Sequence, residues 1–354
     1  MDKRNDITGM LELLSVPGFC VQNHVITALN TSAKGLLLSS GTDISTLLLT
    51  GSREYASFSG GCLYLTLSLG GESWGAAVTR MGDCDIFVLE QEEDQAELRS
   101  MALAARELRE PLTNVMVTAE RLFPMSAQNQ DPHTKEQVAR LNRGLYQILR
   151  ILGNMSDACG RVSRQETCDI SAVIQEITEK SASLMQHAGI TLTYRGLSKP
   201  VYTLADREQL ERALLNILSN AMKFTGAGGT VEVRLIQEGS LLSLSVLDSG
   251  SSIADGILQS LFRRYLRQPV IEDSRFGIGL GMVLIRNAAS AHGGTVLVDQ
   301  PGDTGTRVTM TLAIRHSHDV QLRSPILRVD YAGERDHGLL EFSETLPVFL
   351  YEKE

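Results

Sequence analysis

The stretch from Leu214 to Thr225, LLNILSNAMKFT, constrains the fold of this 354-residue chain more than any other. Its apolar residues recur three or four positions apart, which predicts one face of a buried helix. Asn216 and Asn220 lie one turn apart and share a face, and Lys223 follows them. GAGG at 226–229 then ends the helix, because glycine adopts left-handed backbone readily. Two amides and a lysine on a buried helix need a polar ligand, and later glycine-rich segments predict a nucleotide with a divalent metal.

The overall charge and the cysteines limit the class of protein. A formal net charge of −9 argues against a general binder of nucleic acid or of anionic membranes. The 5 cysteines form no CxxC pair, which predicts reduced thiols. The N-terminal sequence MDKRNDITG lacks the apolar segment of a signal peptide, and no apolar run approaches the roughly 20 residues that span a bilayer. We therefore expect a cytoplasmic protein without a membrane span.

Residues 1–90 are expected to form one small α/β domain. Phe19 to Asn30 predicts two short strands with a turn near Asn23, and short helices follow. Three segments separated by GG and MGD turns then predict an antiparallel meander: Cys62 to Leu69, Trp74 to Arg80 and Asp85 to Leu89. This order of elements, together with the stretch VITALNTSAKGLL, resembles a PAS sensor domain. The resemblance implies a domain that binds a small ligand or dimerises.

Residues 91–160 are expected to form a helical hairpin. Apolar residues from Leu98 to Val115 repeat at three and four positions, so a first helix should run from the acidic segment EQEEDQAE to about Phe123. His133 to about Ala158 predicts a second amphipathic helix after a short turn. The hairpin cannot cover its own apolar stripe, so two copies should pair as a dimeric four-helix bundle. An intramolecular spacer is the alternative.

Residues 161–315 are expected to form an α/β sandwich, with helices on one face of a mixed sheet. Asn220 offers a carboxamide oxygen suited to Mg²⁺, and Lys223 can reach phosphate oxygens. Asp248 ends the strand LLSLSVLD and can accept a hydrogen bond from an exocyclic amine such as that of adenine. Glycines at a helix start let backbone N–H groups approach phosphate. The last helix opens on Gly277, Gly279 and Gly281. The fold class of the whole chain is therefore α+β, with several domains.

In this order the motifs resemble those of bacterial two-component sensor histidine kinases, over about residues 95–315. The third domain is similar to the ATP-binding domain shared with DNA gyrase and the heat-shock chaperone ATPases. The matching segments are Asn216 to Lys223, Asp248-Ser-Gly250, the lid-like Phe262 to Tyr265, and Gly277 to Gly281. The resemblance implies Mg²⁺ and ATP, with Asn220 on the metal and Asp248 on adenine. Asn216 stands where related ATPases carry a water-activating glutamate, so rapid hydrolysis is not expected from an amide.

The first helix of the hairpin departs from the family at its central position. ARELREPLTNV, Ala105 to Val115, resembles the dimerisation and phosphoacceptor motif SHELRTPLT, and Glu107 matches. Arg106 stands where the family has its phosphoaccepting histidine. A guanidinium group stays protonated and delocalised, so it is a poor nucleophile. Autophosphorylation of the family type should therefore fail.

These observations favour a histidine kinase family protein that binds ATP, lacks its phosphoacceptor and signals by conformation. Its expected partners are a second copy of itself and a response regulator or another histidine kinase. The first alternative is an active kinase that phosphorylates another residue or a partner chain. The second is an ATPase or a purely structural dimer. Beyond the family's usual end, residues 316–354 are expected to form a β-hairpin from Ile326 to Tyr331 and Gly338 to Phe342.

Overall fold

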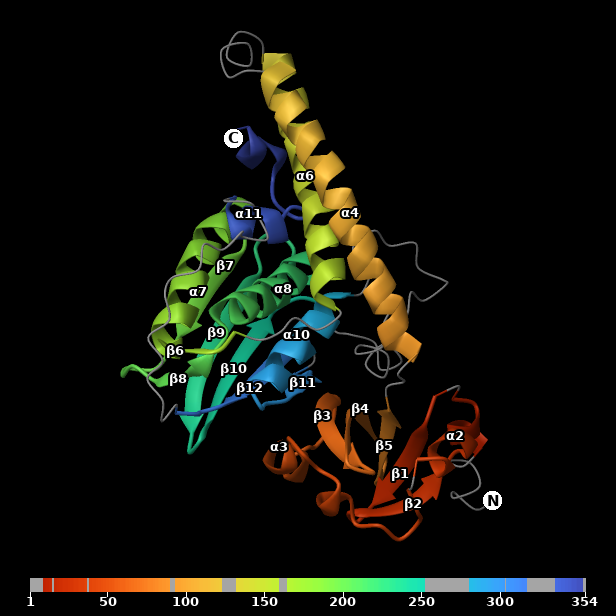
Figure 1. The fold of residues 1–354 in the computed structure, drawn as a ribbon. Coiled ribbons are helices and arrows are strands. Elements are labelled where there is room, and N and C mark those ends of the chain that lie inside the picture. Colours follow the sequence, from red (N-terminus) through yellow and green to blue (C-terminus); the bar gives the residue numbers. More distant parts are fainter. Residues whose placement is uncertain are drawn as a thin grey trace.

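The computed structural model describes residues 9–14, 16–36, 38–89, 93–122, 132–158, 164–251, 280–302, 304–316 and 335–352. Figure 1 shows an N-terminal β-rich domain, a long helical hairpin, an α/β domain, and short C-terminal helices beside the hairpin. Within these ranges, no helix has the length and apolar character needed to cross a bilayer.

The N-terminal domain has five antiparallel strands in the order β2-β1-β5-β4-β3. They are β1 (Gly18–Gln22), β2 (Val25–Leu29), β3 (Cys62–Leu69), β4 (Glu72–Met81) and β5 (Cys84–Leu89). Between β2 and β3 lie α2 (Thr31–Lys34), a 3-10 turn (Ile44–Thr46) and α3 (Ser52–Ala56). The predicted order of two strands, short helices and three strands is confirmed, although α3 was not predicted. The predicted turn is confirmed as well, because Asn23 has a positive φ of 51°.

A buried amide explains how this domain begins. Asn30 is 1% exposed, and its Oδ1 accepts hydrogen bonds from the backbone N–H groups of Gly18 (3.0 Å) and Ala33 (2.9 Å). Its Nδ2 donates to the carbonyl groups of Leu11 (3.2 Å) and Val16 (2.8 Å). One side chain therefore caps α2 and also holds the segment that leads into β1.

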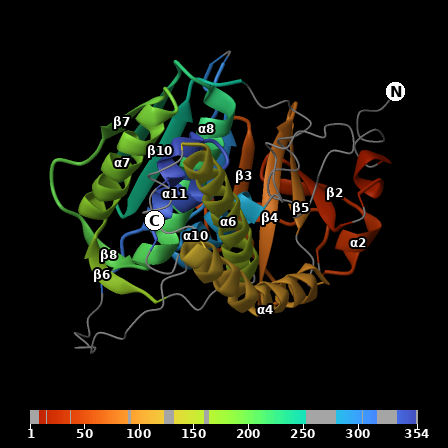
Figure 2. The same ribbon diagram turned by 90° about the horizontal axis from the view of Figure 1, so that it is seen from above.

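The predicted helical hairpin is confirmed as α4 (Glu93–Leu122) and α6 (Pro132–Ala158), which pack side by side (Figures 1 and 2). α4 continues through Pro111. α6 buries one face against the α/β domain, including Leu145, Leu149 and Leu152. Figures 1 and 2 both show α6 lying between α4 and the α/β domain. The pairing of two hairpins in a dimer stays a prediction.

The α/β domain has the predicted mixed sheet with helices on one face (Figure 1). Its strands run in the order β11-β12-β10-β9-β7, and only β7 and β9 are parallel to each other among these neighbours. A separate two-stranded sheet pairs β6, which was not predicted, with β8. The elements are β6 (Glu166–Asp169), α7 (Ile170–His187), β7 (Thr191–Arg195), β8 (Tyr202–Ala205), α8 (Arg207–Thr225), β9 (Thr230–Glu238), β10 (Leu241–Asp248), α10 (Leu280–Ala291), β11 (Val296–Asp299) and β12 (Arg307–Ala313).

The sheets of the N-terminal and α/β domains are joined edge to edge. β3 pairs antiparallel with β11, so that ten strands form one sheet. The guanidinium of Arg286 on α10 lies 5.1 Å from the centre of the Tyr64 ring on β3. Gly61 precedes β3 with a φ of +86°, and a Cβ there would lie 2.3 Å from the carbonyl oxygen of Val298. The close approach of the two edges therefore needs glycine at this position.

The C-terminal segment contains α11 (His337–Glu341) and a 3-10 helix, η3 (Val348–Tyr351). The predicted β-hairpin is therefore wrong in its second strand, from Gly338 to Phe342. A short apolar run such as GLLEF fits a strand or a helix equally well. The side chain of Asp336 decides, because it accepts a hydrogen bond from the backbone N–H of Leu339 at 2.8 Å and caps the helix. The other predicted strand, Ile326 to Tyr331, lies outside the described residues.

Candidate functional site

The helix α8 presents the two predicted asparagines to the start of α10. Asp206 caps α8 by accepting from the backbone N–H of Gln209 at 3.2 Å, and Gly226 ends it with a φ of +71°. Asn216 is 1% exposed, and its Nδ2 donates to the carbonyl of Arg212 at 2.9 Å. A Cβ at Gly281 would lie 3.2 Å from Asn216 Oδ1 and 4.0 Å from Asn220 Nδ2. The structure thus brings Asn216, Asn220 and Gly281 together.

The end of β10 meets the end of the same helix α8. Asp248 is 9% exposed, and its Oδ1 accepts from the backbone N–H groups of Gly250 (2.8 Å) and Thr306 (3.4 Å). Burial raises the pKa of Asp248, although these two hydrogen bonds act in the opposite direction. A Cβ on Gly250 would lie 2.4 Å from the carbonyl oxygen of Phe224. Glycine at 250 therefore lets the turn after Asp248 pack against the end of α8.

Not all of the predicted site residues lie within the described ranges. Gly277 and Gly279, together with the lid-like Phe262 to Tyr265, lie outside the described residues. Arg106 and Glu107 are placed, and both side chains are exposed on α4. Because α6 lies between α4 and α8, the structure does not group these two residues with the asparagines (Figure 1).

Lys223 has a partner that the sequence did not predict. Its side chain is 7% exposed and forms an ion pair with Glu344, which follows α11. Arg150 on α6 contacts the same Glu344 at 2.9 Å and also contacts Glu341 at 3.0 Å. Its third contact is a hydrogen bond that it donates to Ser219 Oγ on α8 at 3.1 Å.

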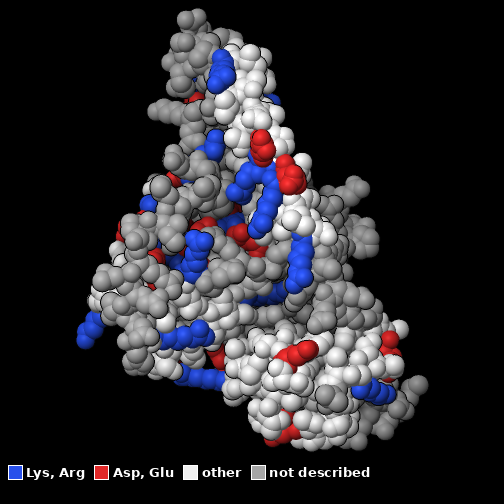
Figure 3. All heavy atoms as spheres, in the orientation of Figure 1, with Lys and Arg blue, Asp and Glu red and all other residues white. Residues whose placement is uncertain are grey.

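A second arginine extends this group of charges. Arg212 on α8 forms an ion pair with Asp157 and donates to Asn154 Oδ1 at 2.8 Å, both on α6. Its Nε lies 3.8 Å from Glu341 Oε1. We call the six charged side chains the charge cluster: Arg150, Asp157, Arg212, Lys223, Glu341 and Glu344. The charge cluster joins α6, α8 and the C-terminal segment. On the surface face drawn in Figure 3, acidic and basic side chains also lie close together beside the hairpin.

The pKa shifts of Lys223 and Glu344 differ in their cause. Burial, helped by the nearby charge of Arg150, lowers the pKa of Lys223 even though Glu344 acts to raise it. Burial alone would raise the pKa of Glu344, but the charges of Arg150 and Lys223 outweigh it and lower this pKa. One carboxylate thus lies between two cations, whereas Lys223 has another cation beside it.

The residues around Asn216 fit a magnesium ion bound together with phosphate. Asn216 Oδ1 is buried and has no hydrogen-bond partner among the described residues. Such an oxygen is a suitable ligand for Mg²⁺, which usually takes few protein ligands and completes its shell with phosphate oxygens and water. Asn220, on the same face, offers a second carboxamide. Among the described residues, no group of three or more His, Cys, Asp or Glu side chains could hold a metal ion.

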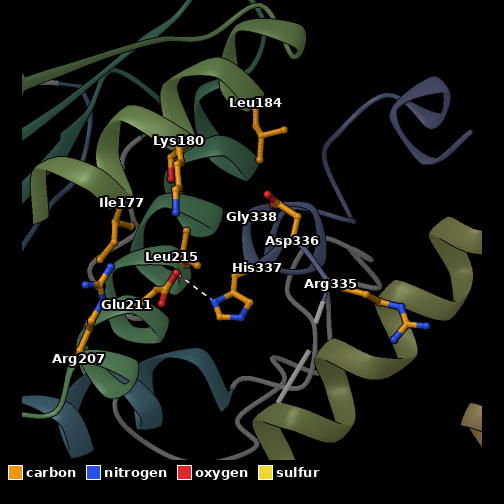
Figure 4. A pocket seen from close by; sticks show the side chains of 11 residues that line it. Ile177, Lys180, Leu184, Arg207, Glu211, Leu215, Arg335, Asp336, His337 and Gly338 are labelled. Atoms are coloured by element: carbon orange, nitrogen blue, oxygen red, sulfur yellow. Dashed lines mark ion pairs between the residues drawn. The ribbon is translucent and has the colours of Figure 1, made fainter. Parts of the chain in front are cut away.

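Two other features of this domain have a different role. His292 at the end of α10 is 2% exposed; its Nδ1 lies 2.7 Å from the carbonyl of Ala288, and its Nε2 accepts from the backbone N–H of Asp206 at 2.9 Å. Burial lowers its pKa. Because both ring nitrogens contact backbone groups, His292 is a structural residue. A cavity of about 280 Å³ lies between α7, α8 and α11, where His337 contacts Glu211 at 3.0 Å (Figure 4). None of its lining residues is a predicted site residue.

Comparison with known proteins agrees with the ATP-binding domain that the sequence motifs predicted. Residues 205–316 match the family of histidine kinase-, DNA gyrase B- and HSP90-like ATPases. An uncharacterised sensor-like histidine kinase of Rhizobium meliloti is 27% identical over 273 residues, which are 72% of this chain and 51% of that protein. The sensor histidine kinase RppB of Synechocystis is 27% identical over 248 residues, 68% of this chain and 53% of that protein.

A solved structure is also similar. Full-length ShkA in complex with AMPPNP has a TM-score of 0.49 and 21% identity, and the match covers 62% of this chain and 46% of that one. The chain spans about half the length of the two relatives named above. Residues 205–316 therefore form an ATP-binding domain of the histidine kinase-, DNA gyrase B- and HSP90-like ATPases. Over about 70% of its length the chain is similar to sensor histidine kinases.

Proposed function

We propose that the chain binds Mg²⁺–ATP between α8, the end of β10 and the start of α10. The observation that carries this proposal is the buried, unpartnered Oδ1 of Asn216 beside Asn220 and Gly281. Asn220 and Asn216 would hold the metal, and the buried carboxylate of Asp248 would accept a hydrogen bond from the adenine amine. Gly281, with Gly277 and Gly279, would let the backbone approach phosphate.

The bound metal would neutralise phosphate charge, and the chain's own residues decide the fate of the nucleotide. Asn216 cannot remove a proton from water, because a carboxamide is not a base near neutral pH. The proposed site therefore retains ATP rather than hydrolysing it rapidly.

We infer further that the chain does not phosphorylate itself by the family's route. Arg106 stands at the acceptor position and is exposed on α4, so access is not the obstacle. Its guanidinium has no free lone pair with which to attack a phosphoryl group. The protein would then act through its conformation, or through a response regulator or another histidine kinase.

The hairpin supports a homodimer. Leu108 and Val115 are each 52% exposed on α4 and lie seven residues apart, and Leu122 continues the series at 68%. On α6, Leu141 and Ile148 repeat the spacing at 38% and 45% exposure. Exposed apolar side chains that recur every seven residues on two neighbouring helices are typical of a helical bundle that is completed by a second copy of the chain.

The N-terminal domain is proposed to be a PAS-like sensor. Its five antiparallel strands and the short helices between β2 and β3 support this assignment. The ligand or stimulus would then act on a domain whose edge strand is paired with the ATP-binding domain.

Label transfer tests the proposal directly. The wild-type protein and Arg106→His are incubated with γ-labelled ATP, after ATP binding has been measured by calorimetry. We expect both to bind ATP and only Arg106→His to gain acid-labile, alkali-stable label. Such label on the wild-type chain would refute the loss of autophosphorylation. When a second histidine kinase is added to the reaction, label on that kinase would favour the alternative of phosphorylating a partner chain. Failure of both proteins to bind ATP would refute the site itself.

A further inference from the structure

The C-terminal segment from Arg335 to Glu352, which we call the C-terminal strap, is fastened to the hairpin. Arg143 on α6 donates to the carbonyl groups of Ser343 and Glu344, each at 2.8 Å. Gln147 and Asn142, on the same helix, donate to Ser343 (3.1 Å) and Tyr351 (3.0 Å). These side chains hold the strap by its backbone carbonyl groups.

The strap is also fastened to α8, the helix that carries the proposed metal ligands. Ser219 Oγ donates to the carbonyl of Glu341 at 3.1 Å, and the Glu341 side chain is 0% exposed between the two arginines of the charge cluster. Figures 1 and 2 both show α11 between α6 and the helices of the ATP-binding domain. The strap therefore bridges the hairpin and the ATP-binding domain.

One contact of the strap involves a side chain of the proposed ATP site. Glu344 is ion-paired with Lys223, which lies seven residues after Asn216 and three after Asn220 on α8. These spacings place all three side chains on the same side of the helix. A phosphate group and a carboxylate are similar acceptors for an ammonium group. With a side chain only 7% exposed, Lys223 has little room for both anions.

We propose that the C-terminal strap inhibits nucleotide binding, with Glu344 holding Lys223 in the place of an ATP phosphate. ATP must displace this carboxylate before Lys223 can bind phosphate. Because Glu344 also pairs with Arg150, its displacement weakens the attachment of the strap to α6. Linkage makes the effect reciprocal, so ATP loosens the strap to the extent that the strap weakens ATP. This inference rests on the proposed ATP site.

Calorimetry with a matched pair of variants tests the inference. Glu344→Gln keeps the shape of the side chain but removes its charge. Glu352→Gln is the control, because it makes the same charge change in the strap. It loses only one ion pair, 2.5 Å long, with Lys135 on α6. We expect Glu344→Gln to bind Mg²⁺–ATP at least about fivefold more tightly than wild type, and Glu352→Gln to match wild type. Adenosine, which has no phosphate, should bind equally to all three.

Each other result overturns the inference in a recognisable way. Equal ATP affinity in wild type and Glu344→Gln means that the carboxylate does not compete with phosphate. Weaker ATP binding in Glu344→Gln means that Glu344 orients Lys223 for the nucleotide. Tighter adenosine binding means that the effect is not at the phosphates. If adenosine binds but ATP affinity is unaffected, the site stands and the inference falls; if neither ligand binds any of the three proteins, the proposed function falls with it.

A second measurement needs no variant and so does not depend on the folding of Glu344→Gln. The backbone N–H of Leu340 and that of Phe342 donate within the strap, at 3.1 and 2.9 Å. Their hydrogen exchange in the wild-type protein should be at least about fivefold faster at saturating Mg²⁺–ATP than without nucleotide. Exchange that is unchanged or slower with bound ATP overturns the inference.

Discussion

Glu341 offers a sharp test of how the charge cluster holds the strap. Its side chain is 0% exposed and contacts Arg150 at 3.0 Å and Arg212 at 3.8 Å. Glu341→Gln preserves the volume and leaves each arginine another carboxylate, Glu344 for Arg150 and Asp157 for Arg212. The substitution changes the formal charge of the cluster from zero to +1, in a place that water does not reach.

The expected cost can be worked out from these contacts. Removing one partner of a buried ion pair costs about 3–5 kcal/mol when the other charge is left alone. Here neither arginine is left alone, so the loss should approach that of one hydrogen bond between charged groups, about 2 kcal/mol. This free energy corresponds to a roughly 30-fold change in an equilibrium constant.

Native-state hydrogen exchange is the suitable assay, because a chain of several domains need not unfold in one step. The amides of Leu340, Phe342 and Leu346, which donate within the strap, should lose about 30-fold protection in Glu341→Gln. Glu352→Gln removes only a partly exposed ion pair and should cost less than about 1 kcal/mol, or roughly fivefold. Equal protection in the two variants would refute the reasoning, since buried and exposed charges would then contribute alike.

Three further predictions concern the site and the dimer. Asp248→Asn should weaken adenosine binding by about 1.5–3 kcal/mol in calorimetry. Protonation of Asp248 removes the carboxylate that accepts the hydrogen bond, so the affinity of the wild-type protein for adenosine should fall as the pH is lowered. Because burial raises the pKa of Asp248, this fall should begin at a higher pH than it would for an ordinary aspartate. Asp248→Asn should lack this pH dependence. Gly281→Ala should weaken Mg²⁺–ATP binding, because its methyl group would lie 3.2 Å from Asn216 Oδ1. The free energy of unfolding should change by less than about 1 kcal/mol. Unchanged ATP affinity would contradict this prediction. Leu108→Glu should lower the dimer fraction in sedimentation, because a symmetric interface receives the charge twice, and an unchanged mass would exclude this stripe.

Periodicity predicted most of the fold because it reports which side of an element is buried. Apolar spacing predicted the second half of α8, Leu214 to Thr225, and in the structure the helix begins after its capping residue, Asp206. GLLEF at 338–342 is too short for its period to separate strand from helix, so the cap at Asp336 was decisive.

Part of the candidate site was predictable for a different reason. Asn216, Asn220 and Lys223 stand on one helix, and helical spacing alone places them on one side. The partner of Lys223 was not predictable, because Glu344 lies more than a hundred residues away and no local pattern connects them. Arg150 gave only a weak signal, as a charge inside the apolar face of α6.

The joined sheet has a consequence for the separate domains. β3 and β11 cover each other's backbone groups through three residue pairs, Cys62–Val298, Leu63–Leu297 and Tyr64–Val296. A fragment that begins after Leu89 would leave the N–H and C=O groups of β11 open along that edge. An unpaired edge is a template for strands of other chains. The ATP-binding domain cut from its N-terminal neighbour is therefore expected to self-associate through β11, and its oligomeric state would then misrepresent that of the whole protein.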